Sequence, residues 1–114
     1  MATIKEKEGM IENFYYYNSH EKQFRCIHAK RVVIPGFEDM LLYIHEMIDR
    51  SDRYTVSEGI TGLLLESGST KEIAINEARI YLVKNEYKIG DAILKQIEKT
   101  GISPSFLDML YCGE

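Results

Sequence analysis

Runs of strand-forming residues recur along this chain, and only short polar or glycine-containing connections separate them. Phe14–Tyr17 leads through a polar turn into residues 23–34, and Tyr54–Glu58 leads through Gly59-Ile60-Thr61-Gly62 into residues 63–66. Parallel strands need crossovers of about a dozen or more residues, whereas a hairpin closes with about two to five. The spacing therefore predicts an antiparallel sheet of about four to five strands.

The segment Met40–Ile48 fits two kinds of element. Apolar residues at helical spacing, with Glu38 and Asp39 before them, suit an amphipathic helix. As a strand, the same apolar run is followed by a polar loop and then by Tyr54–Glu58, which is the arrangement of a hairpin. Because the later strands need a partner, we interpret the segment as a strand and keep the helix as the alternative.

The sequence after Gly68 has the pattern of a helix that covers the sheet. Ser69-Thr70-Lys71-Glu72 is a capping box, in which Ser69 would cap the helix and Glu72 would bond back to it. Apolar residues then recur at helical spacing and predict one buried face over residues 70–84. We therefore expect an α+β protein whose antiparallel sheet is packed by this helix.

The C-terminal part of the chain predicts one or two further short helices. Residues 89–97 repeat isoleucine and leucine at helical spacing, and Gly101 suits the left-handed position that often ends a helix. Ser103-Pro104 has the order of a cap followed by proline, as at the start of a last helix that would reach Leu110.

Length and charge limit the architecture and the partners. A chain of 114 residues has room for one core, and we expect a flexible N-terminal arm over residues 1–9 and a single domain over residues 10–114. Fourteen basic and eighteen acidic side chains give a net charge of −4, so the broad basic surface of a nucleic-acid-binding protein is not expected. The sequence shows neither a signal segment nor a membrane-spanning run, and we expect a cytoplasmic protein without a membrane partner.

Histidines, cysteines and carboxylates are the candidates for chemistry. They lack the spacings of zinc motifs, and nucleotide-binding glycine loops are absent, so neither a metal nor a cofactor is predicted. If their strands are neighbours, His28 and His45 would face each other and act with Glu46 or Glu58 as acid and base in phosphodiester cleavage. A small metal-independent nuclease or hydrolase is therefore the alternative from the enzyme class. Cys26 shares a strand face with His28, although a cysteine on a strand is more commonly a small buried apolar residue.

Tyr15, Tyr16 and Tyr17, with Arg25 and Arg31 on the next predicted strand, form the surface that we select for binding a protein partner. Tyrosine and arginine are favoured at interfaces, and an exposed strand can accept a strand from a partner. The same tyrosines and the nearby cations would also suit single-stranded nucleic acid, which is a second alternative that the net negative charge disfavours.

The helical half offers another candidate surface. Residues 58–114 hold six basic and nine acidic side chains, so this half carries most of the acidic excess. An acidic helical face around Glu77, Glu86 and Asp91 would attract a basic partner.

Residues 54–78 resemble part of a known family. Tyr54–Glu58, then Thr61-Gly62-Leu63 and then Ser67–Ala78 are similar, in their order and in the capped helix, to the strand, strand and helix segment of HicB-type antitoxins. The resemblance implies a partial RNase H-like fold without catalytic carboxylates, and a function in binding and blocking a small toxin ribonuclease. The chain departs from the family's pattern by its additional N-terminal hairpin and by a tail, residues 89–111, that does not read clearly as a DNA-binding module.

The chain also looks like small accessory proteins of phages and other mobile elements in its size, acidity and lack of motifs. We therefore expect a non-catalytic protein-binding module, a small inhibitor or antitoxin-like protein that binds a partner or associates with itself. A motif does not encode the identity of that partner, because specificity depends on side-chain geometry across a surface.

Overall fold

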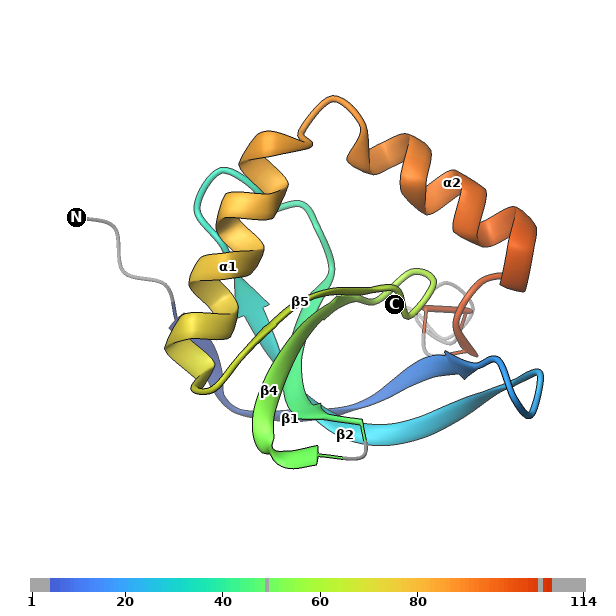
Figure 1. Cartoon of the computed structure of the whole chain (residues 1–114), viewed down its shortest axis with the longest axis horizontal. Coiled ribbons are helices and arrows are strands. Elements are labelled where there is room, and N and C mark those ends of the chain that lie inside the picture. The colour runs from blue at the N-terminus through green and yellow to red at the C-terminus, as the bar shows by residue number, and fades with distance from the viewer. Residues whose placement is uncertain (1–4, 49, 105, 108–114) are drawn as a thin grey trace.

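Five antiparallel strands and two helices make up the part of the chain that the structure describes (Figure 1). The structure is a computed structural model, and it describes residues 5–48, 50–104 and 106–107. The elements follow one another as β1 (Lys5–Asn18), β2 (Gln23–Val33), β3 (Leu42–Met47), β4 (Arg50–Glu58), β5 (Leu64–Gly68), α1 (Lys71–Lys84) and α2 (Ile89–Thr100). Each strand pairs with its neighbour in sequence, in the order β1-β2-β3-β4-β5. The predicted α+β class with an antiparallel sheet is confirmed.

β1 begins earlier than the sequence predicts. Lys5 pairs with Val33 at the far end of β2, which is long enough to offer partners to residues before Met10. β1 is an edge strand of the sheet, with a partner strand on one side. Residues 5–9 of the expected N-terminal arm therefore belong to β1, and residues 1–4 lie outside the described residues.

The ambiguous segment before residue 48 forms the strand β3. Leu42, Tyr43, Ile44 and His45 are all buried, although successive strand residues point to opposite faces of a sheet. Leu42 and Ile44 pack in the core with α1, and Tyr43 packs with Phe14 on the other face. A central strand covered on both faces explains why apolar residues follow one another without alternation, and the helical alternative is wrong.

Thr70, and not Ser69, caps α1. The backbone of Thr70 is extended, and its hydroxyl oxygen accepts a hydrogen bond from the Ile73 amide at 3.1 Å. The helix starts at Lys71, so Glu72 lies in the first turn near the positive end of the helix dipole and is not placed for the predicted capping box. α1 then packs on the sheet through its buried residues Ala74, Ile75, Ala78 and Leu82.

α2 ends as the sequence predicts. Gly101 has a φ of +90°, and its amide donates to the Ile97 carbonyl. The chain then returns to the sheet, where the Ser103 amide donates to the Ile60 carbonyl at 2.7 Å. The described residues after Ser103, which are Pro104, Phe106 and Leu107, are helical, as expected at the start of a last short helix. Leu110 lies outside the described residues. Among the described helices, none is long and apolar enough to cross a membrane.

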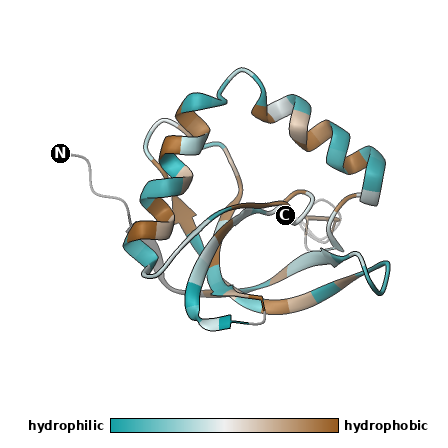
Figure 2. Cartoon of the chain, viewed as in Figure 1, coloured by the Kyte–Doolittle hydropathy of each residue, from teal (hydrophilic) through white to brown (hydrophobic). Residues whose placement is uncertain are grey.

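The sheet is curved, and its two faces form two separate clusters of apolar residues. α1 lies over β4 and β5, and the long β1–β2 hairpin runs out below α2 (Figure 1). On the face covered by α1, the larger cluster includes Val32, Leu42 and Val56. On the opposite face, Phe14, Ala29 and Tyr43 form a smaller cluster, which contains no residue of a described helix. Brown apolar and teal polar positions alternate along both helices, as expected for helices with one side turned to the protein (Figure 2).

Candidate functional site

β2 and β3 pair over a short stretch and then separate. Among the described residues their pairs are Lys30 with Ile44, Arg31 with Tyr43 and Val32 with Leu42. On its other side β2 remains paired with β1 as far as Gln23, and β3 remains paired with β4 as far as Met47. Residues 23–29 of β2 and residues 45–47 of β3 are therefore not paired with each other, and the register of the pairs before them sets residues 27–29 opposite residues 45–47.

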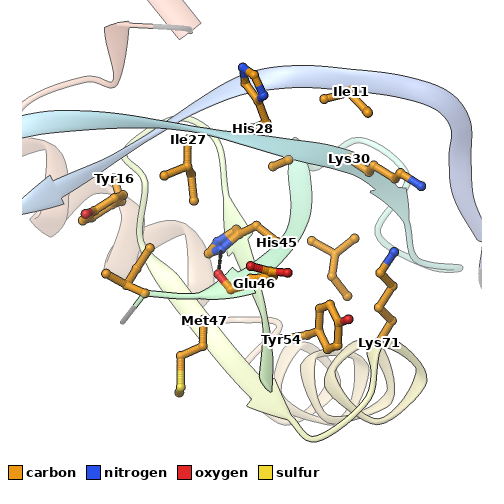
Figure 3. Close-up of a pocket in the computed structure, with 13 residues that line it drawn as sticks. Ile11, Tyr16, Ile27, His28, Lys30, His45, Glu46, Met47, Tyr54 and Lys71 are labelled. Carbon is orange, nitrogen blue, oxygen red and sulfur yellow. Dashed lines mark hydrogen bonds between the residues drawn. The ribbon is translucent and has the colours of Figure 1, made fainter. Parts of the chain in front are cut away.

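The space between these two edges is a cleft of about 630 Å³, which we name the β2–β3 cleft (Figure 3). It is lined by Ile11, Tyr16, Ile27, His28, Ala29, Lys30, Ile44, His45, Glu46, Met47, Ile48, Tyr54 and Lys71. Tyr16 and Ile27 lie along its β1–β2 side and Met47 lies across from them (Figure 3). The cleft thus combines apolar side chains with two strand edges and a small number of charged groups.

His45 lies in the wall of the cleft and is almost completely buried, with 4% of its surface exposed. Its Nδ1 is 2.7 Å from the Glu46 carbonyl oxygen, and its Nε2 is 2.8 Å from the Ser57 hydroxyl. Since a carbonyl can only accept, Nδ1 carries the proton and Nε2 accepts from Ser57. Burial lowers the pKa of His45 below its ordinary value, so the ring is neutral at pH 7.

Both basic and acidic groups line the cleft. Lys30 comes from β2 and Lys71 from the first turn of α1, and their amines lie at the same end of the cleft (Figure 3). The Lys71 ammonium also lies 5.7 Å from the centroid of the Tyr54 ring, which is within the range of a cation–π interaction. Glu46 also lines the cleft, so the charged residues of the lining are two lysines and one glutamate.

The residues of the enzyme alternative are only partly brought together. His28 and His45 both line the β2–β3 cleft, as their neighbouring strands allow. Glu58 is fully buried, and its carboxylate accepts hydrogen bonds from the amides of Ile60 and Thr61 and from the Thr61 hydroxyl. This carboxylate holds the β4–β5 turn and is not among the groups that line the cleft.

The geometry of His45 does not favour acid–base catalysis. Both of its ring nitrogens are engaged within the fold, and its hydroxyl partner Ser57 has no exposed surface. A general base must reach the proton that it removes, and a nucleophile must reach its substrate. His45, in the wall of the cleft, and its buried partner Ser57 are therefore interpreted as structural polar residues.

Two of the three tyrosines selected as a partner surface, Tyr16 and Tyr17, lie in different surroundings, and Tyr15 is only partly exposed. Tyr16 lines the β2–β3 cleft and packs with the Phe14 cluster. Tyr17 stacks edge-on against Phe24, with 5.4 Å between ring centroids. Tyr17 also lines a smaller space of about 250 Å³ beside the end of α2. Successive side chains of a strand point to opposite faces, so Tyr16 and Tyr17 lie on different faces of β1. Of the three tyrosines, Tyr16 is the one that lines the β2–β3 cleft.

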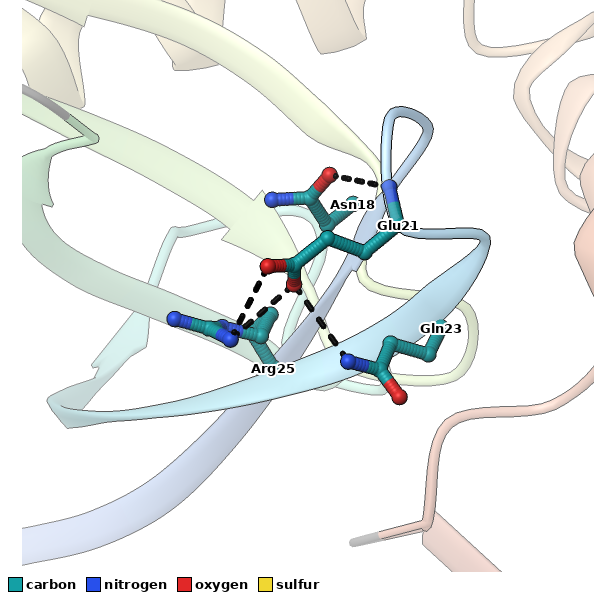
Figure 4. Close-up of polar contacts among 4 residues, drawn as sticks. All are labelled: Asn18, Glu21, Gln23 and Arg25. Atoms are coloured by element: carbon teal, nitrogen blue, oxygen red, sulfur yellow. Dashed lines mark hydrogen bonds and ion pairs between the residues drawn. The ribbon is translucent and has the colours of Figure 1, made fainter.

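The two arginines of that surface support the fold locally. Arg25 forms an ion pair with Glu21 at 3.0 Å, and Glu21 in turn receives a bond from Gln23 at the tip of the hairpin (Figure 4). Arg31 pairs with Glu12 at 3.3 Å and lies over the Tyr43 ring.

Tyr43 connects Arg31 to β1. Its hydroxyl donates to Glu12 at 3.0 Å, and burial raises the pKa of this hydroxyl. The described structure thus places neither Arg25 nor Arg31 in the β2–β3 cleft.

Other sequence candidates are distributed over the surface. Glu77 lies on α1, Glu86 in the connection and Asp91 on α2, and all three are exposed. Cys26 is an exposed free thiol, which differs from the buried position that its strand context favours. The described residues hold no group of three or more His, Cys, Asp or Glu side chains that could bind a metal ion.

Sequence reasoning did not identify Tyr54, Met47 and Lys71 as site residues. The lengths of the strands could have indicated the cleft. The segment that forms β2 is longer than the one that forms β3, so part of β2 extends beyond the end of β3 and has no partner there. Lys71 belongs to a helix, and only the packing of α1 over β4 brings it to the same cleft as His28.

Comparisons of the chain with protein-family models, with curated proteins and with solved structures give no match. The function of the β2–β3 cleft is therefore inferred from its own geometry.

Proposed function

We propose that this chain is a non-catalytic protein-binding protein, and that the β2–β3 cleft receives an extended segment of its partner. The observation that carries the proposal is the pair of facing strand edges, residues 27–29 of β2 and 45–47 of β3, with a cleft of about 630 Å³ between them. Backbone amides and carbonyls at a strand edge are a template for another strand. A segment placed there would continue the sheet.

The side chains of the cleft suit such a segment. Main-chain hydrogen bonds supply affinity in strand addition, and side chains of the added strand supply specificity by entering pockets on alternate sides. Tyr16, Ile27 and Met47 offer partly buried apolar surface, and Lys30 and Lys71 offer charge at one end. The lining thus provides both kinds of contact within one cleft.

β2 offers the longer template. Seven residues of β2 and three of β3 have no partner across the β2–β3 gap, and of the seven on β2 the residues Ile27, His28 and Ala29 line the cleft. A bound segment would therefore make most of its backbone hydrogen bonds with β2. The tyrosine surface of the sequence analysis contributes to this proposal through Tyr16.

In the cell, such binding would make this chain an inhibitor or an antitoxin-like protein. A partner whose extended segment is held in the cleft would be blocked or tethered by this chain. We place the interaction in the cytoplasm, where a reducing environment would preserve the exposed thiol of Cys26. Membership of the HicB-type antitoxins stays a prediction.

Site-directed photo-crosslinking in the native cell tests the proposal. A benzophenone side chain in place of Met47, at the lip of the cleft, should capture a partner, and the same group in place of the exposed Val83 on α1 should not. Hydrogen exchange with the purified partner should then show slower exchange of amides in residues 24–29. Equal capture at both positions, or unchanged exchange in β2, would overturn the proposal.

A further inference from the structure

The β2–β3 cleft is closed at one end. Lys30 and Ile44 are the pair at which the two strands meet, and both residues line the cleft. From that pair the edges separate toward Gln23 and Met47. A strand that lies between them in the plane of the sheet cannot continue past the closing pair. A chain end fits there without a turn.

The closed end is the basic end of the cleft. Lys30 belongs to the closing pair, and the amine of Lys71 reaches the same end from α1 (Figure 3). His28 lies two residues before Lys30, so it shares the same strand face. The lining as a whole holds two lysines and one glutamate, Glu46, in a chain whose net charge is −4. The two lysines of the lining thus lie at the closed end of the cleft.

We infer that the β2–β3 cleft binds the C-terminal end of a partner polypeptide, with the terminal carboxylate between Lys30 and Lys71. The inference rests on the proposed strand addition. A carboxylate forms charge-assisted hydrogen bonds with ammonium groups, whereas a terminal amine would be repelled by them. Capture of a C-terminal carboxylate is a known mode of peptide recognition.

The position of the carboxylate determines the direction of the bound segment. β2 runs from Gln23 toward the closed end, and β3 runs away from it. A segment whose C-terminus lies at the closed end is therefore parallel to β2 and antiparallel to β3. Its last residues would lie beside Lys30 and Ile44, and its upstream residues would leave the cleft between Gln23 and Met47.

Two displayed peptide libraries test the inference. One presents random eight-residue segments with a free C-terminus, and the other presents them with both ends joined to the carrier. We expect this protein to enrich sequences from the first library. Enrichment from the second library alone would overturn the C-terminal inference and leave strand addition standing. Absence of enrichment from both would overturn strand addition as well.

A charge comparison then tests the role of the lysines. The enriched peptide is synthesised as the free acid and as the C-terminal amide, and amidation should weaken binding by about tenfold or more. Lys71→Gln should weaken binding of the acid and leave the amide nearly unchanged, whereas Lys84→Gln, at the other end of α1, should change neither. Equal affinities of acid and amide for the unaltered protein would overturn the assignment.

Discussion

The backbone of Gly62 lies directly against the backbone of Tyr15, so the β4–β5 connection contacts β1, the strand at the other edge of the sheet. A Cβ atom at Gly62 would collide with the Tyr15 carbonyl oxygen and would lie 2.9 Å from the Tyr16 Cα atom. This contact brings the two ends of the curved sheet together. It also encloses the Phe14 and Tyr43 cluster, which no described helix covers.

Gly62→Ala should therefore destabilise the protein strongly. Gly62 has a φ of +82°, which an alanine adopts only with strain, and the Cβ would meet backbone atoms that cannot move independently. We expect a loss of about 2 kcal/mol or more in the free energy of unfolding, measured by urea denaturation. Gly90→Ala, in α2 where a Cβ would meet nothing within 4 Å, is the control and should not destabilise. Equal effects at both positions would contradict the closure contact.

The buried imidazole of His45 should make stability depend on pH. Burial lowers its pKa in the folded state below the value of 6.5 that it has when exposed, so the unfolded chain binds a proton more readily. The contribution of neutral His45 to the free energy of unfolding is complete above pH 6.5, and it is lost as the pH falls from 6.5 toward the pKa of His45 in the folded state. His45→Gln should flatten this part of the curve of unfolding free energy against pH. The same slope in both proteins would assign it to other groups.

Glu58 should prove to be a structural residue. Glu58→Ala would remove the acceptor for two buried amides and one hydroxyl in the β4–β5 turn. We expect a loss of about 2 to 4 kcal/mol of stability, measured by denaturant unfolding. Glu86→Ala, at an exposed carboxylate, should cost less than about 0.5 kcal/mol. A fully stable Glu58→Ala protein would mean that the turn does not need this carboxylate.

The cap of α1 provides a matched pair of adjacent residues. Thr70→Ala should cost about 1 kcal/mol because the Ile73 amide loses its acceptor. Ser69→Ala should change the unfolding free energy little, since Ser69 is exposed and precedes the cap. Thermal unfolding of the two variants measures the difference. A larger loss at Ser69 would restore the capping box that the sequence alone suggests.

Local sequence signals predict most of the strands and helices of this protein. Short connections between strand-forming runs excluded parallel crossovers, and the glycine after residues 89–100 marked the end of α2. These signals are local, because a turn or a cap depends on residues a few positions apart. Local signals do not distinguish neighbouring residues of the same kind. Ser69 and Thr70 are equally good caps on sequence grounds, so the predicted start of α1 was wrong by one residue.

The candidate site depends on packing between residues that are distant in the sequence. Packing places Tyr16 and Tyr17 in different surroundings and encloses Glu58 in a turn. It also engages both ring nitrogens of His45 in hydrogen bonds within the fold. It also brings Lys71 to Lys30, across some forty positions of sequence, at the end of a cleft. The cleft exists because β2 is longer than β3 and the sheet curves, and both depend on packing between distant residues.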